Sequence, residues 1–217
     1  MKPKIIYVYD ALCGWCFGFS PVMQAIHDAY CKEFDFEIIS GGMMLREGAG
    51  RISKVVAHIQ DTYKRVEETT GIIFGLAFLK NLEEGEMIFN SETPAMALSA
   101  FKRMQPENAF EFAVHIQNSV YFDGKEPEHI DLYRYLAVNY GIDPDEFEQT
   151  MTSQAAKDEA HYDFALAKQL NVSAYPAVFI QQNDTHFYMV AKGYADYETM
   201  ELRISNVKKE MDYLSAR

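Results

Sequence analysis

The sequence has little positive charge, and this shortage argues against one large class of partners. Its 20 lysines and arginines are outnumbered by 32 aspartates and glutamates, which gives a net charge of -12 and a pI near 4.9. No basic stripe offsets this charge, so most of the surface would repel a polyanion. We therefore expect no nucleic-acid partner.

Long apolar runs and export features are also missing. The longest apolar run, GIIFGLAFL at residues 71–79, is about half of the roughly 20 residues that a membrane-spanning helix needs. The start, MKPKIIYVYD, contains a run of five apolar or aromatic residues, fewer than the roughly 7 to 15 of a signal-peptide core. We expect a cytoplasmic protein with no membrane partner, and thiols stay reduced in that compartment.

The order of the predicted elements favours an α/β fold. Residues 5–9 form a β-branched and aromatic run that is typical of a buried strand. Apolar residues then recur at helical spacing from 16 to about 34, and 36–39 has the pattern of a second strand. A strand, a helix and a strand in this order predict a parallel βαβ unit.

The middle of the chain is predicted to be helical, and strands return near its end. Helices are expected at about 50–68, 91–104, 108–120, 130–140, from Pro144 onward and at 154–170, with a turn around 71–85. Two strands at 177–181 and 187–190 and a helix at 197–214 follow. A helical block of about a hundred residues therefore interrupts an α/β unit.

Two of the three cysteines, Cys13 and Cys16, lie in the sequence CGWC directly after the first predicted strand. With His27 and Cys31 they could supply four zinc ligands. Because the intervening residues follow a helical period, His27 would lie roughly 15 Å or more from the pair. We therefore expect no metal. Two small core side chains are a second interpretation, but a pair at a strand-to-helix turn favours reactive thiols.

The first turn of a helix suits a reactive thiol. Unpaired backbone N–H groups and the positive end of the helix dipole favour the thiolate of Cys13. Cys16 shares a helical face with Cys13, so the two sulfurs can close a disulfide. Cys31 is expected to be a packed thiol, and His27 a boundary residue of the helix.

These motifs resemble the thioredoxin-fold superfamily, and in particular its DsbA-type, FrnE-like disulfide oxidoreductases. CGWC after a strand matches the family's CxxC, and Pro21 matches its helix-kinking proline. Residues 172–180, VSAYPAVFI, resemble the segment V-x-G-x-P, whose proline is cis, although Ala174 replaces the glycine. Segments at 121–132 and 137–143 are similar to the inserted helical domain of FrnE-like proteins.

The resemblance implies a fold and a site. The fold is a thioredoxin-like domain at 1–44 and 153–217, with an inserted all-helical domain at 45–152. If the strand at 177–181 pairs antiparallel with that at 5–9, Pro176 lies beside Cys13 and leaves the Tyr175 backbone free for an extended substrate. The site residues are Cys13, Cys16 and Pro176 for catalysis, and Gly14, Trp15 and Tyr175 for substrate binding, with a core anchor as the other reading of Trp15.

Three functions stay open at this point. The favoured one is a thiol-disulfide oxidoreductase, a cytoplasmic reductase or isomerase that acts on protein or peptide thiols and disulfides. It needs no bound cofactor, and glutathione is a candidate co-substrate. A second resemblance, to kappa-class glutathione transferases and hydroxychromene-carboxylate isomerases, implies a serine at the nucleophile position, against which the two cysteines argue. The third is a non-enzymatic chaperone module, which the 11 methionines permit.

The sequence around the cysteines also bears on the direction of electron flow. Gly14 and Trp15 bring no charge to stabilise a thiolate, and Asp10 together with the net negative charge would oppose one. We therefore expect a reduction potential nearer the roughly -270 mV of thioredoxin than the roughly -120 mV of a strong periplasmic oxidant.

Overall fold

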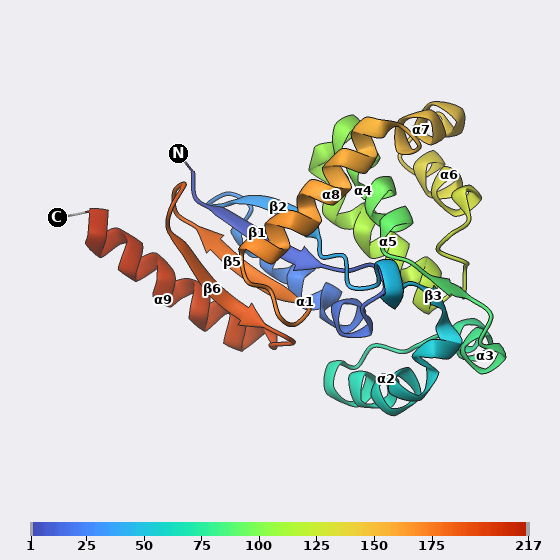
Figure 1. Cartoon of the computed structure of the whole chain (residues 1–217). Coiled ribbons are helices and arrows are strands. Elements are labelled where there is room, and N and C mark those ends of the chain that lie inside the picture. The colour runs from blue at the N-terminus through green and yellow to red at the C-terminus, as the bar shows by residue number, and fades with distance from the viewer. Residues whose placement is uncertain (1, 216–217) are drawn as a thin grey trace.

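A four-stranded sheet lies at the centre of the computed structural model, which describes residues 2–215 (Figure 1). The strands are β1 (Lys4–Tyr9), β2 (Asp35–Ser40), β5 (Ala177–Gln181) and β6 (Phe187–Lys192). In the order β2-β1-β5-β6, β1 is parallel to β2 and antiparallel to β5, and β5 is antiparallel to β6. The α/β class predicted from the sequence is confirmed.

The two faces of the sheet are covered by different helices. Tyr7 and Tyr9 of β1 point into a core shared with α1 (Gly14–Tyr30) and α9 (Tyr197–Ser215). The alternate residues Ile6 and Val8 pack on the other face, against α8 (Gln154–Gln169). Successive side chains of a strand point to opposite faces, so one apolar strand supplies both layers.

The helical block consists of six helices with short connections. They are α2 (Val56–Thr70), α3 (Leu76–Glu84), α4 (Glu92–Met104), α5 (Ala109–Tyr121), α6 (Ile130–Val138) and α7 (Pro144–Met151). Phe101 of α4 and Phe112 of α5 stack with ring centroids 4.0 Å apart, and both belong to the same buried cluster as Tyr7. The block and the sheet therefore share one core, and the division into domains at residues 44 and 152 stays a prediction.

A second buried cluster lies behind the CGWC turn. Leu12 and Phe17 pack there against Val66 of α2 and against Phe74 and Phe78. The approach of α1 to α2 depends on a glycine, since a Cβ on Gly18 would lie 2.8 Å from the side chain of Thr70. This cluster positions α2 beside the cysteines.

The segment before α2 differs from the helix predicted at 50–68. Gly50 has φ +133°, which is not helical, and Gly50–Arg51 forms a short strand, β3, that pairs with β4 (Ile88–Phe89). A 3-10 turn, Ile52–Lys54, follows before α2 begins at Val56. The positive φ of Gly50 and the short strand that it begins place the start of the helix at Val56, whereas the periodicity predicts a start near residue 50.

The turn predicted around 71–85 is wrong, because it contains α3. This nine-residue helix ends at Glu84 and is capped by Gly85, whose φ of +74° suits a glycine. Phe74 and Phe78 are buried, whereas Leu76 is 86% exposed, so the apolar run is mainly a core segment with one exposed side. None of the helices within residues 2–215 is long and apolar enough to cross a membrane.

Candidate active site

The CGWC turn joins the end of β1 to the start of α1. Cys13 is the N-cap residue of α1, with extended φ and ψ of -101° and 109°, and its Sγ accepts a hydrogen bond from the Cys16 N–H at 3.2 Å. Both cysteines are free thiols. An N-cap sulfur faces the unpaired N–H groups and positive end of the helix, the environment that favours a thiolate.

The two thiols differ in their surroundings. Cys16 is fully buried, whereas Cys13 retains 5% exposure at the surface of a groove. Burial raises the pKa of the Cys16 thiol well above its usual value, and its hydrogen bond with Cys13 and the Cys13 charge act in the same direction. The arrangement therefore suits Cys13 as the attacking thiol and Cys16 as the second, protected one.

Asp10 lies beneath the turn rather than at the surface. It is 1% exposed, and its carboxylate accepts hydrogen bonds from Leu12 N (2.9 Å), Met43 N (2.7 Å) and the Ser91 hydroxyl (3.0 Å). Because the Met44 N–H donates to Ser91 Oγ at 2.9 Å, the hydroxyl is oriented to donate its own proton to Asp10. Burial raises the pKa of Asp10, although these hydrogen bonds act the other way.

A buried amide holds the other side of the turn. The Ser20 hydroxyl lies 3.1 Å from Cys16 O and 2.9 Å from Gln117 Oε1, and Gln117 Nε2 donates to Asp10 O at 3.1 Å. Gln117 belongs to α5, so the helical block contributes directly to the redox turn. Ser20, Ser91 and Gln117 carry no motif, and sequence reasoning did not identify them.

The proline predicted for the site lies at the start of β5. The Tyr175–Pro176 peptide bond is cis, and β5 pairs antiparallel with β1, with Val8 opposite Ala177. Pro176 therefore lies next to the end of β1, although its contact with the Cys13 sulfur stays a prediction. Its carbonyl accepts a hydrogen bond from Gly193 N at 2.7 Å.

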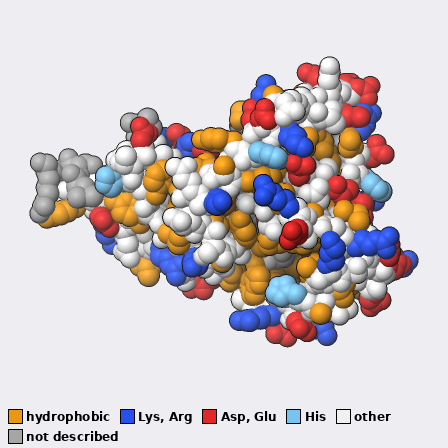
Figure 2. Space-filling view, in the orientation of Figure 1, with side chains coloured by type: hydrophobic (Ala, Val, Ile, Leu, Met, Phe, Trp, Pro, Cys, Tyr) orange, Lys and Arg blue, Asp and Glu red, His pale blue; other side chains and the backbone are white. Residues whose placement is uncertain are grey.

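An apolar groove of about 240 Å³ opens beside Cys13, and Figure 2 shows orange side chains around this hollow. It is lined by Leu12, Cys13, Gly14, Trp15, Met43, Met44, Val55, His58, Ile59, Thr62, Tyr63, Val66, Phe74, Phe89, Tyr121 and Tyr175. Gly14, Trp15 and Tyr175 thus lie together with Cys13 in one groove, and their role in substrate binding stays a prediction. Trp15 is half-buried, with its ring centroid 6.3 Å from that of Tyr194. The wall formed by α2 was not predicted.

The other proposed zinc ligands lie elsewhere. His27 and Cys31 line a different hollow, near the C-terminal end of α1, and His27 packs edge-on against Phe36. No group of three His, Cys, Asp or Glu side chains within residues 2–215 is arranged to hold a metal. Cys31 is exposed, so the prediction of a packed thiol is wrong. It lies in the cap after α1, because the helix ends at Tyr30 rather than near residue 34.

Comparison with known proteins places this site in a family. The family model described as thioredoxin matches residues 7–202. A structure from Nitrosomonas europaea, assigned provisionally as a protein disulfide isomerase, is 25% identical and superposes with a TM-score of 0.86, covering 97% of this chain and 99% of that one.

Two more distant proteins are also similar to this chain, the first in its fold and the second in its sequence. The cytosolic disulfide reductase DsbM from Pseudomonas aeruginosa is 19% identical with a TM-score of 0.79, covering 97% of this chain and 99% of its own, and a second structure of it is described with GSH. The ClpXP adapter protein SpxH from Halalkalibacterium halodurans is 23% identical over 84% of this chain. The matched region spans 60% of that curated relative.

Proposed function

The chain belongs to the thioredoxin family, and we propose that it is a thiol-disulfide oxidoreductase whose Cys13–Cys16 pair reduces or isomerises disulfides in the cytoplasm. One observation carries the proposal: the Cys13 sulfur caps α1, accepts the Cys16 N–H at 3.2 Å and opens into an apolar groove. A capped thiolate beside a second thiol is what disulfide exchange requires.

In the proposed reaction, the Cys13 thiolate attacks one sulfur of a substrate disulfide. The substrate S–S bond breaks, a Cys13 mixed disulfide forms and the first substrate thiolate leaves, taking up a proton. Cys16 then loses its proton, attacks the Cys13 sulfur and releases the second substrate thiol. The substrate disulfide gains two electrons, and the Cys13–Cys16 pair becomes a disulfide. A low-molecular-weight thiol from solution then reduces the pair to the dithiol.

The same chemistry permits isomerisation when a substrate thiol resolves the mixed disulfide before Cys16 does. Burial of Cys16 favours this alternative, because its raised pKa leaves little thiolate to compete. The proposed substrates are protein or peptide disulfides, since the groove lining is apolar and aromatic. Glutathione is the proposed electron donor, and no bound cofactor takes part; the GSH-bound structure of the Pseudomonas reductase supports this choice of thiol.

The test is a set of cysteine variants assayed by insulin reduction. Cys13→Ser should abolish turnover, whereas Cys16→Ser should accumulate a mixed disulfide that mass spectrometry locates on Cys13. Cys31→Ser is the matched control and should keep full activity, because Cys31 lies outside the groove. In the Cys31→Ser variant, which lacks the exposed third thiol, labelling of Cys16 ahead of Cys13 by an alkylating reagent at neutral pH would refute the assigned roles.

A non-enzymatic role is the second candidate, supported by the similarity to the ClpXP adapter protein SpxH. In that case the apolar groove would bind a polypeptide and the thiols would be incidental. The Cys13→Ser/Cys16→Ser double variant would then bind peptides as well as the native protein, while the native protein would show no redox turnover.

A further inference from the structure

A second hollow, of about 780 Å³, lies beside the groove on the other side of the segment that follows β2. We propose that this hollow binds a carboxylate of the substrate, so that disulfide-bearing peptides with an acidic residue near the reacting cysteine are preferred. The inference rests on the proposed function and names the substrate class of that same site. Two observations support it: the positive charge of the side chains that line the hollow, and the position of the hollow next to the groove that contains Cys13.

The hollow is cationic in a chain of net charge -12. Arg46 and Lys168 both line it, and within residues 2–215 neither side chain has an ion-pair partner. Figure 2 shows Lys, Arg and His side chains on this face over α8, with Asp and Glu side chains between them. Two unpaired cations in an otherwise acidic surface create a local attraction for an anion that the rest of the molecule repels.

The acidic side chain in the hollow does not cancel this charge. Glu92 also lines it, but its Oε1 lies 2.5 Å from His161 Nε2 and 3.3 Å from Lys157 Nζ. The hydrogen bond with His161, followed by that with Lys157, lowers the pKa of Glu92 despite its partial burial. Glu92 is thus already matched by other groups, and Arg46 and Lys168 stay available to a ligand.

The walls of the hollow suit a side chain rather than a bare ion. Leu45, Phe164 and Ala165 supply apolar surface beside the two cations. Such a mixture fits an aspartate or glutamate, in which a methylene stem carries the carboxylate. A polyanion would meet the surrounding negative surface, so a single carboxylate is the better match.

The hollow and the groove are separated by a single backbone segment. Tyr175 lines the groove, and its hydroxyl donates to Gly41 O at 2.7 Å, while Gly41 and Gly42 line the hollow. A Cβ on Gly41 would lie 2.1 Å from the Tyr175 ring, and one on Gly42 would lie 2.8 Å from the Phe164 ring. An extended peptide advances about 3.3 Å per residue, so an acid placed two to four residues from the reacting cysteine samples a span of about 7 to 13 Å from Cys13 toward the hollow.

Matched peptides test the proposal. Each carries one cysteine as a mixed disulfide with 2-mercaptoethanol and a single Glu, or Gln in the matched peptide, placed two, three or four residues before or after it. At one or more positions the Glu peptide should have a kcat/KM about threefold to tenfold higher at low ionic strength, and the advantage should shrink in 0.5 M NaCl. A carboxylate on a small molecule is tested separately, with dithiodipropionic acid against its diamide.

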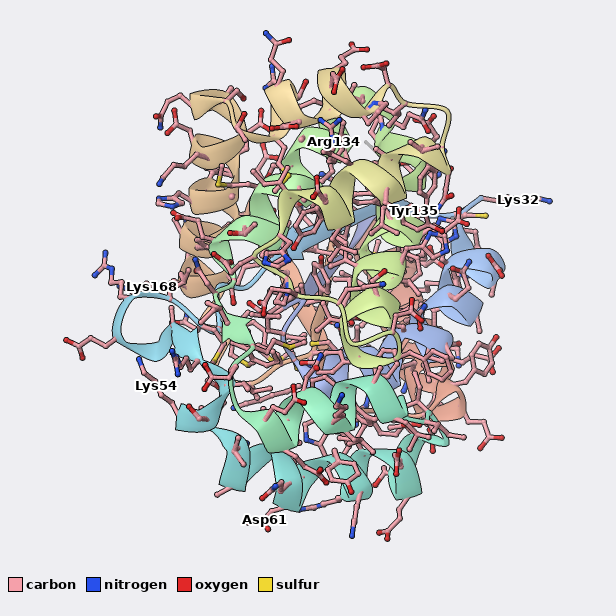
Figure 3. The ribbon with its side chains drawn as sticks, turned by 90° about the vertical axis from the view of Figure 1, so that its right-hand side faces the viewer. Lys32, Lys54, Asp61, Arg134, Tyr135 and Lys168 are labelled. Carbon is pink, nitrogen blue, oxygen red and sulfur yellow. The ribbon has the colours of Figure 1, made fainter. Side chains whose placement is uncertain are left out.

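Charge-removing variants identify the groups that bind. Arg46→Gln/Lys168→Gln should bring the Glu-to-Gln ratio close to one, whereas Lys32→Gln should keep the native ratio. Lys32 projects from the side of the molecule opposite Lys168 (Figure 3). A ratio of one at every position in the native protein, or an unchanged ratio in the double variant, would overturn the proposal.

Direct binding measurements distinguish a failure of the carboxylate site from a failure of the proposed oxidoreductase function. The same peptides with Ser in place of Cys can be titrated against the native protein, with fluorescence of Trp15, the single tryptophan, as the readout. Tighter binding of the Glu peptide without any redox turnover would support the carboxylate site and refute the oxidoreductase. Equal binding together with equal turnover of both peptides would refute the carboxylate site and leave the oxidoreductase standing.

Discussion

Substitution of Asp10 by Asn should make the Cys13–Cys16 pair more oxidising. The Asp10 carboxylate accepts the Leu12 N–H at 2.9 Å, and its backbone carbonyl accepts the Cys13 N–H at 3.1 Å, so a buried negative charge sits within the redox turn. That charge opposes a thiolate in the reduced protein but has little effect on an uncharged disulfide. Its removal should therefore stabilise the reduced form.

The size of the effect can be set from Coulomb's law if the carboxylate and the thiolate are taken as unit charges separated by about 7 Å. Two unit charges about 7 Å apart at an effective dielectric constant of about 20 repel by about 2.4 kcal/mol. For a two-electron couple, about 1.4 kcal/mol corresponds to about 30 mV, so the potential should rise by about 30 to 60 mV. The amide turns a donor toward the Met43 N–H, and this mismatch should cost about 1 to 3 kcal/mol of stability.

The assay is redox equilibration with glutathione buffers, in which the fraction of oxidised pair is read by alkylation and mass spectrometry. Asp163→Asn is the matched control, because the negative charge of this second buried carboxylate is balanced by the Lys102 ammonium, 3.0 Å away. Its potential should stay within about 10 mV of the native value. An unchanged or lower potential in Asp10→Asn would refute the electrostatic role of Asp10.

Two further substitutions probe the core and the wall of the groove. Lys102→Ala removes the cation beside Asp163 and should lower the free energy of unfolding by about 3 kcal/mol at pH 8, because the buried carboxylate is left unpaired. Burial raises the pKa of Asp163 above its usual value, so the loss should become smaller as the pH falls toward 5 and the carboxylate takes up a proton. An equal loss at both pH values in urea unfolding would contradict this prediction. Gly41→Ala places a Cβ 2.1 Å from the Tyr175 ring and should lower kcat/KM for peptide disulfides by about tenfold. The control Gly48→Ala, whose added Cβ would have no neighbour nearer than 4.0 Å, should match the native protein. Equal kinetics for the two variants would show that Tyr175 is not part of the site.

Local pattern was sufficient to predict most of the fold. Short continuous apolar runs located β1 and β2, and the 3.6-residue spacing of apolar side chains located α1, while the family motif added Cys13, Cys16 and Pro176. α3 was missed because nine residues between two glycines resemble a turn when no partner is known. The apolar face of α3 is buried only in the folded chain, where Phe78 packs into the cluster behind the cysteines.

The support beneath the cysteines could not be predicted from local pattern. Ser91 is 81 residues from Asp10, and Gln117 is 107 residues from it, so only the folded chain brings them together. The sequence identified Asp10 as a charge near Cys13 but gave no sign that it is buried and fully hydrogen-bonded. The cationic hollow could not be predicted for the same reason, because Arg46, which precedes α2, and Lys168 of α8 are far apart in the sequence.

The reduction potential of the native Cys13–Cys16 pair tests the central claim most directly. The helix terminus favours the Cys13 thiolate, and the buried Asp10 carboxylate opposes it. The residues that line the groove include no lysine or arginine that would offset the carboxylate. In glutathione buffers the pair should behave as a two-electron couple with a potential nearer roughly -270 mV than roughly -120 mV. A potential above about -150 mV, or no Cys13–Cys16 disulfide at any buffer ratio, would contradict a cytoplasmic reductase or isomerase.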